Sequence, residues 1–80
     1  MSTYTLLCIF EGREQGLTYE LTYDEVIDEI WNIVKGIYPN LPKSNIRPRF
    51  DEEHSKYVYE KRHAENGNMS FEFWEEDKEN

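Results

Sequence analysis

Residues 22–38 carry the clearest structural signal in this chain. Their sequence, TYDEVIDEIWNIVKGIY, repeats apolar residues at spacings of three and four, the period of one helix face. The apolar positions are Val26, Ile27, Ile30, Ile33, Val34 and Ile37. Thr22 and Glu25 match a capping box at the start, while Gly36 followed by Pro39 provides a stop. We therefore expect one amphipathic helix on which the rest of the chain must pack.

The residues before this helix predict a β-hairpin. Residues 4–10, YTLLCIF, are apolar at both alternating sets of positions, which is typical of an interior strand of a sheet. Residues 11–16 are polar and contain two glycines, and they predict a turn. Residues 17–21 alternate apolar and polar side chains, as a half-exposed strand does. This hairpin leads directly into the helix.

Three further strands are expected after the helix. Residues 46–50 contain Pro48, which restricts that strand to an edge of the sheet. Residues 56–62 and 69–75 lie on either side of Asn66-Gly67, a hairpin turn signal. A two-residue turn there would set Lys61 opposite Glu72 and Tyr59 opposite Trp74, and both pairs are favourable. A three-residue loop would shift this register.

The element order is therefore β-β-α-β-β-β. It predicts an α+β fold in which a single helix packs on a four- to five-stranded, mostly antiparallel sheet. This order resembles that of β-grasp (ubiquitin-like) domains, a resemblance of topology that no sequence motif accompanies. The diglycine with which conjugated ubiquitin-like modifiers end is absent, because the chain ends Lys78-Glu79-Asn80, so conjugation is not expected. We expect one domain over residues 1–80, with residues 76–80 frayed.

Composition narrows the class of partner and the compartment. The formal charge is −8, with acids concentrated in residues 1–42 and 64–80. Such a surface repels phosphate, so direct nucleic-acid binding is not expected, whereas a protein with a basic surface would be attracted. Cys8 is the only cysteine, no apolar run is long enough to cross a membrane, and no basic segment opens the chain. We expect a cytoplasmic protein that does not bind membranes.

Motifs that carry chemistry are missing. No phosphate loop, dinucleotide fingerprint or nucleophile elbow occurs, and Cys8 lies in a predicted strand where its thiol would be inert. A domain of this size leaves little room for a pocket of about 300 Å³ or more. The spacing around Asp51, Glu53 and His54 matches neither a zinc site nor an EF-hand loop. The sequence predicts no enzyme, no cofactor and no metal.

One basic spot, Arg47 and Arg49 on either side of Pro48, has Tyr57 and Tyr59 nearby in sequence. Arginines and aromatic rings together can stack RNA bases. The overall charge argues against this interpretation, and we expect these arginines to pair with the acids of residues 51–53.

Aromatic residues make up 15% of the chain, and six of them are tyrosines, which are enriched at protein interfaces. The preferred hypothesis is a non-catalytic, acidic binding module that regulates or inhibits a larger, possibly nucleic-acid-binding protein. The candidate partner-binding residues are acidic or aromatic: Asp24, Asp28, Trp31, Glu72, Trp74, Glu75, Glu76 and Asp77. The alternative is a homodimer that buries the second face of its sheet. That face carries Tyr4, Leu6, Cys8 and Phe10 if Leu7 and Ile9 face the helix.

Overall fold

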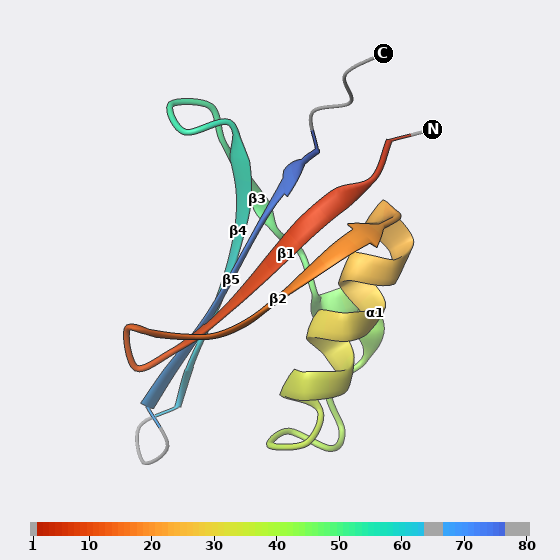
Figure 1. Ribbon diagram of the computed structural model, residues 1–80. Helices are drawn as coiled ribbons and strands as arrows, with labels where there is room; N and C mark the ends of the chain where they lie inside the picture. The colour runs from red at the N-terminus through yellow and green to blue at the C-terminus, as the bar shows by residue number, and fades with distance from the viewer. Residues whose placement is uncertain (1, 64–66, 77–80) are drawn as a thin grey trace.

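The computed structural model describes residues 2–63 and 67–76 (Figure 1). The elements along the chain are β1 (Tyr4–Phe10), β2 (Arg13–Leu21), α1 (Tyr23–Val34), the 3₁₀ helix η1 (Lys43–Asn45), β3 (Arg49–Asp51), β4 (Lys56–His63) and β5 (Gly67–Glu75). The strands form one antiparallel sheet in the order β2-β1-β5-β4-β3, and α1 packs on one face of it. The predicted fold class is therefore confirmed, and β1 is an interior strand as expected.

Helix α1 starts where its sequence predicts. The Thr22 hydroxyl accepts a hydrogen bond from the Glu25 backbone N–H, and the Glu25 carboxylate accepts one from the Thr22 N–H at 2.8 Å. The helix ends at Val34 with Lys35 as its C-cap, which agrees with the stop predicted at Gly36, and Ile37 of the predicted apolar stripe lies beyond the helix. From Gly36 onward the backbone closes tighter turns, in which the Ile37 N–H bonds to the Val34 carbonyl at 3.0 Å. Glycine is a weak helix former, and a proline three residues later prevents the helix from resuming.

The core lies between α1 and the sheet. The helix buries Val26, Ile27, Ile30 and Val34. They meet buried side chains from the rest of the chain, namely Leu6, Ile46, Tyr59, Met69, Phe71 and Phe73. Ile33, predicted to share the buried stripe, is 43% exposed. It lies on the flank of that stripe, over a hollow of about 220 Å³ that it lines with Cys8 and Phe10.

The first hairpin is longer than predicted. Strand β2 starts at Arg13, so the turn predicted over residues 11–16 is wrong. Only Glu11 and Gly12 form the turn, and both have positive φ, at 53° and 76°. Two positive φ values are typical of a type I′ turn, whose twist matches that of the flanking strands. Strand β2 also carries two register shifts against β1, and such bulges protect a sheet edge from pairing.

The register of the last hairpin differs from the prediction by three residues. Tyr57 lies opposite Phe73 and Tyr59 opposite Phe71, so the predicted pairs of Lys61 with Glu72 and Tyr59 with Trp74 are wrong. His63 pairs with Gly67, which leaves three residues for the connection. Gly67 belongs to β5, and Asn66 of the predicted turn lies outside the described residues. The observed register stacks aromatic rings from β4 and β5 on one face of the sheet.

The short strand after the helix lies further along than predicted. Residues 46–50 were expected to form it, but β3 spans Arg49–Asp51 and follows Pro48 directly. It pairs only with β4 and so occupies an edge, as the proline predicts. Ile46 is instead a buried core residue that follows η1.

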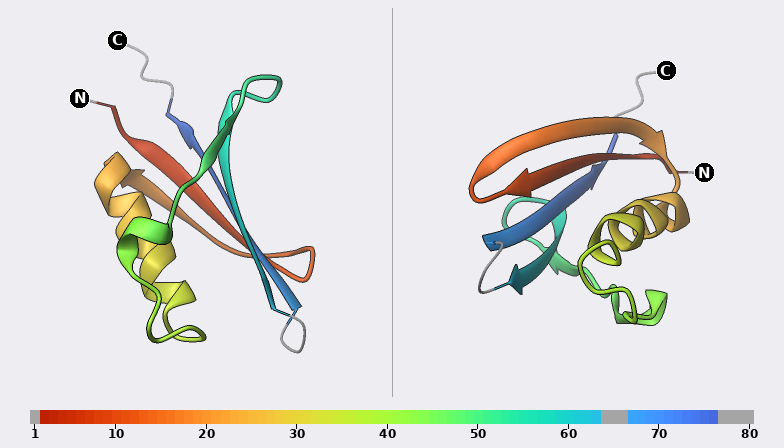
Figure 2. Two further views of the ribbon diagram at one scale, coloured as in Figure 1. Left: turned by 180° about the vertical axis from the view of Figure 1, so that it is seen from behind. Right: turned by 90° about the horizontal axis from the view of Figure 1, so that it is seen from below.

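The two faces of the sheet carry different side chains. Tyr4, Leu6 and Cys8 of β1 pack toward α1. The arrangement considered from the sequence, in which Leu7 and Ile9 face the helix, is therefore wrong. Leu7 and Thr5 point to the other face. Figure 2 shows that the strands extend past the single helix at both ends, at the β1–β2 turn and at the β3–β4 turn. Part of the helix side of the sheet is therefore left uncovered.

Candidate functional site: an aromatic pocket

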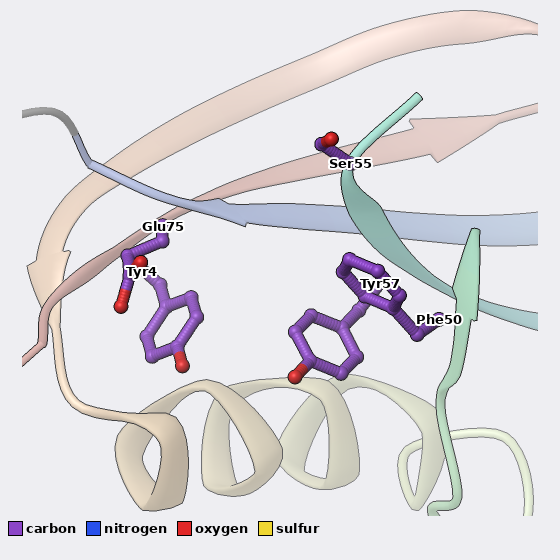
Figure 3. A pocket seen from close by; sticks show the side chains of 5 residues that line it. All are labelled: Tyr4, Phe50, Ser55, Tyr57 and Glu75. Atoms are coloured by element: carbon purple, nitrogen blue, oxygen red, sulfur yellow. The ribbon is translucent and has the colours of Figure 1, made fainter. Parts of the chain in front are cut away.

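The helix side of the sheet holds a pocket of about 380 Å³ near the start of α1 (Figure 3). We call it the aromatic pocket; its lining residues are Tyr4, Phe50, Ser55, Tyr57 and Glu75. They come from β1, β3, β4, β5 and the turn before β4. Cross-strand pairing brings them together, because Tyr4 lies opposite Glu75 and Phe50 lies opposite Tyr57. Figure 3 shows the hydroxyls of Tyr4 and Tyr57 both directed toward the helix.

The expectation that a chain of this size leaves little room for a pocket of about 300 Å³ or more is wrong. A second hollow of about 380 Å³ lies at the loop after α1, lined by residues including Tyr38, Pro39 and Leu41. Such hollows form because the helix is shorter than the strands on which it packs. A helix of 12 residues is about 18 Å long, whereas a nine-residue strand is about 30 Å long. The helix is therefore too short to cover the whole face of the sheet.

Contacts with neighbouring rings hold the aromatic pocket in shape. Tyr57 stacks on Phe73 with centroids 4.8 Å apart and planes inclined by 9°. Phe50 meets the Tyr57 ring edge to face at 4.8 Å. The ring of Tyr23, the first residue of α1, lies edge to face with the rings of Tyr4 and Tyr57, at centroid distances of 5.9 Å and 5.6 Å. Aromatic pairs prefer such offset and edge-to-face geometries, so these contacts stabilise the arrangement of the aromatic rings of the pocket.

Glu75 is the only charged residue among those that line the aromatic pocket, and it is exposed. Burial raises the pKa of the Tyr4 hydroxyl, and the neighbouring Tyr57 and Glu75 act in the same direction. Burial also raises the pKa of Tyr23. Both hydroxyls are therefore neutral at physiological pH, and the pocket combines neutral rings with one carboxylate.

The predicted partner-binding residues on α1 are used partly within the fold. Asp28 pairs with Lys43 at 2.6 Å, and this contact raises the pKa of the lysine. Trp31 donates a hydrogen bond from Nε1 to the Leu41 carbonyl at 2.8 Å, and Lys35 lies over its ring at 4.3 Å. Trp31 thus fastens the loop after the helix. Asp24 is exposed in the first turn.

The predicted residues of β5 do not form one surface. Glu72 lies on the face away from the helix, where it pairs with Lys56 at 2.8 Å, and Trp74 lies on the same face opposite Thr5. Glu75 points to the helix side and lines the aromatic pocket. Glu76, for which the sequence predicts fraying, accepts hydrogen bonds from Thr3, Thr5 and the Glu20 backbone. Asp77 lies outside the described residues.

Of the partner-binding residues predicted from the sequence, Glu75 alone lines the aromatic pocket. The other lining residues, which that prediction did not include, are Tyr4, Phe50, Ser55 and Tyr57. The signal available was the alternation of KYVYEKR, which puts Tyr57 and Tyr59 on one face. Joining them to Tyr4 and Phe50 requires the strand order and the register, and neither follows from spacing.

The turn before β4 places Asp51, Glu53 and His54 together. One ligand atom of each lies within 4.8 Å of the others, an arrangement that can touch a cation. His54 Nδ1 contacts the Asp51 carboxylate at 2.8 Å, and this hydrogen bond lowers the pKa of Asp51. Backbone N–H groups of Glu53 and His54 also donate to Asp51. These hydrogen bonds stabilise the connection between β3 and β4.

The basic spot is arranged differently from the prediction. Arg47 donates from Nε to the Ser44 carbonyl at 3.2 Å, and Arg49 lies 3.8 Å from Glu60 across β3 and β4. The expected pairing with the acids of residues 51–53 is therefore wrong for both arginines. The reason is again the register, which puts Arg49 opposite Val58 and close to Glu60 on the neighbouring strand.

Cys8 lies in β1 and is half-buried. Burial raises the pKa of its thiol, and Glu29 adds to this effect. A raised pKa keeps the sulfur protonated and a poor nucleophile.

Among the described residues, no helix is long and apolar enough to span a membrane. No protein-family model, curated protein or solved structure matches this chain.

Proposed function

We propose that this protein is a non-catalytic docking module that binds a basic protein partner and thereby regulates or inhibits it. The observation that supports this most is the aromatic pocket, which is open to solvent and has Glu75 as its only charged lining residue. Aromatic residues presented at a hollow surface are the usual anchors of protein interfaces. A formal charge of −8 favours a partner of opposite sign and speeds its approach.

The surroundings of the pocket extend this negative surface. The β3–β4 turn beside it carries Glu52 and Glu53, which follow Asp51 at the end of β3. On the other side, the first turn of α1 carries Asp24 and Glu25. Lys56, which precedes Tyr57 in β4, forms an ion pair with Glu72 on the far face of the sheet. A basic partner that contacts the pocket therefore meets acids on both sides of it.

A catalytic role has less support. Ser55 lines the aromatic pocket and follows His54, but the imidazole is bonded to Asp51, and no hydrogen bond between Ser55 and His54 occurs among the described residues. A serine nucleophile needs a base within hydrogen-bond reach. Burial raises the pKa of the Tyr4 hydroxyl, which therefore stays protonated at neutral pH and is not available as a general base.

Self-association through the other sheet face also has less to gain. Thr5, Leu7 and Val58 point to that face and are already 5%, 9% and 7% exposed, so little of their apolar surface remains to be buried. Light scattering over a range of concentrations tests this alternative. A stable dimer whose formation protects Leu17 and Trp74 would favour it over the docking module.

The docking proposal is tested by NMR titration of the labelled chain with a short oligo-lysine peptide and an oligo-glutamate peptide of equal length. We expect the basic peptide alone to shift resonances around Glu75 and the β3–β4 turn, with an affinity that falls as salt is raised. Asp24→Asn together with Glu75→Gln should weaken this binding, whereas Glu14→Gln on the exposed edge strand β2 is the matched control. Absence of binding at low salt, or binding that salt does not affect, would refute the proposal.

A further inference from the structure

The aromatic pocket has the chemistry of a site for one organic cation. Three of its lining side chains are aromatic rings, one is a carboxylate, and none is a lysine or arginine. Cations bind over ring faces through the negative face of the ring, most strongly where water is partly excluded. We propose that the aromatic pocket seats the guanidinium group of an arginine of the partner protein. This assignment rests on the function proposed above and names the group that the pocket recognises.

The rings favour a planar cation. Phe50 is 50% exposed and contacts the ring of Tyr57 edge to face. The Tyr57 ring in turn stacks on Phe73. A guanidinium is flat, weakly hydrated and able to stack on such rings, and its forked N–H groups match a carboxylate. Glu75 supplies that carboxylate from the strand position opposite Tyr4. An ammonium group is more strongly hydrated and offers no flat face, so lysine fits less well.

The start of α1 does not turn the pocket into an anion site. Tyr23 brings the helix N-terminus close, and a free N-terminus would favour an anion. Here Thr22 already accepts a hydrogen bond from one of the first N–H groups, and Asp24 and Glu25 stand in the first turn. Their carboxylates oppose the positive end of the helix dipole. The start of α1 is therefore a poor site for an anion, which agrees with a cation as the occupant of the pocket.

Small blocked amino acids separate this recognition from general charge attraction. N-acetyl-arginine amide should shift the side-chain resonances of Phe50 and Tyr57, whereas N-acetyl-citrulline amide, which is of similar shape but neutral, should leave them unchanged. Tetramethylammonium provides a round cation for comparison. If it shifts the rings while the arginine compound does not, the pocket recognises ammonium groups and the assignment to arginine is wrong.

Variants connect the rings to affinity. Phe50→Ala and Glu75→Gln change exposed side chains, and each should weaken binding of an oligo-arginine peptide about two- to five-fold. Binding of oligo-lysine should change less. Tyr19→Ala and Glu14→Gln are the matched controls, since Tyr19 is 61% exposed on β2 and both lie outside the pocket. Thermal melts verify that every variant is folded.

Two failures are distinguishable. If oligo-arginine and oligo-lysine bind equally and Phe50→Ala changes neither, the arginine assignment is refuted while the docking module stands. If neither basic peptide binds at low salt, the proposed function itself fails.

Discussion

The buried hydroxyl of Thr5 donates a hydrogen bond to the carboxylate of Glu76 over 2.9 Å. The same carboxylate accepts a hydrogen bond from the Thr3 hydroxyl at 2.6 Å and from the Glu20 backbone N–H at 2.8 Å. Glu76 thus joins the end of β5 to β1 and β2. It also supports Glu20, whose φ of 58° is unusual for a residue with a side chain.

We expect Glu76→Ala to lower the free energy of unfolding by about 1–3 kcal/mol, because it leaves the buried Thr5 hydroxyl without this acceptor. Urea denaturation measures the change. Glu75→Ala is the matched control, since Glu75 is exposed and should change stability little. Equal stability of both variants would show that the carboxylate of Glu76 is not needed by the fold.

The first hairpin can be stabilised at its turn. Glu11 and Gly12 both have positive φ, and Asn tolerates this conformation better than Glu. We expect Glu11→Asn to raise the free energy of unfolding by about 0.5–1 kcal/mol. The hydrogen bond from the Glu11 backbone N–H to the Asn68 carbonyl stays in place, because it involves no side-chain atom.

Glu14→Asn tests whether this gain comes from the turn. Glu14 is in β2, where asparagine is disfavoured, and the charge change is the same. Denaturation of both variants side by side separates turn geometry from relief of negative charge. A gain of equal size in both would assign the effect to charge.

The helix cap makes a separate contribution. Thr22→Ala removes the hydroxyl that accepts the Glu25 N–H and should cost about 1 kcal/mol of unfolding free energy. Thr22→Ser keeps a capping oxygen and should restore most of this loss. Ser44→Ala is the control, since the hydrogen bond of Arg47 goes to the Ser44 carbonyl and not to its hydroxyl. A Thr22→Ala variant as stable as Ser44→Ala would contradict the capping box.

Elements that depend on local rules could be predicted from the sequence. The Thr22 cap, the buried positions Val26, Ile27 and Ile30, and the edge position of the strand after Pro48 each follow from a few neighbouring residues. Boundaries were less accurate. The start of β2 was placed by composition, whereas a two-residue turn at Glu11-Gly12 decides it.

The aromatic pocket was not predictable in the same way. Its residues come from the start, the middle and the end of the chain, and they meet through the pairing of Tyr4 with Glu75, of Tyr57 with Phe73 and of Phe50 with Tyr57. A three-residue difference in one hairpin register is enough to replace these partners. The predicted register instead paired Tyr59 with Trp74, which would have dispersed the rings that form the pocket.

Because several tyrosines are buried, the free energy of unfolding depends on pH in the alkaline range. Burial raises the pKa of Tyr4, Tyr23 and Tyr59 above the ordinary value of 10.0. In the unfolded chain these hydroxyls lose their protons near pH 10, whereas in the folded protein they keep them to higher pH. The resulting stability is fully present below pH 10 and is lost as the pH rises through the folded values.

Tyr4→Phe isolates one of these groups, because it keeps the ring in the aromatic pocket and removes the hydroxyl that titrates. We expect the unfolding free energy of this variant to fall less steeply above pH 10 than that of the parent protein. Urea denaturation at a series of pH values from about 8 to 11.5 measures the difference, over the range in which tyrosine titrates. Tyr19→Phe, at a site that is 61% exposed and outside the aromatic pocket, is the control for the removal of a tyrosine hydroxyl. If Tyr4→Phe follows the parent curve, the hydroxyl of Tyr4 titrates alike in the folded and unfolded chain, and its burial beside Tyr57 and Glu75 does not shift its pKa.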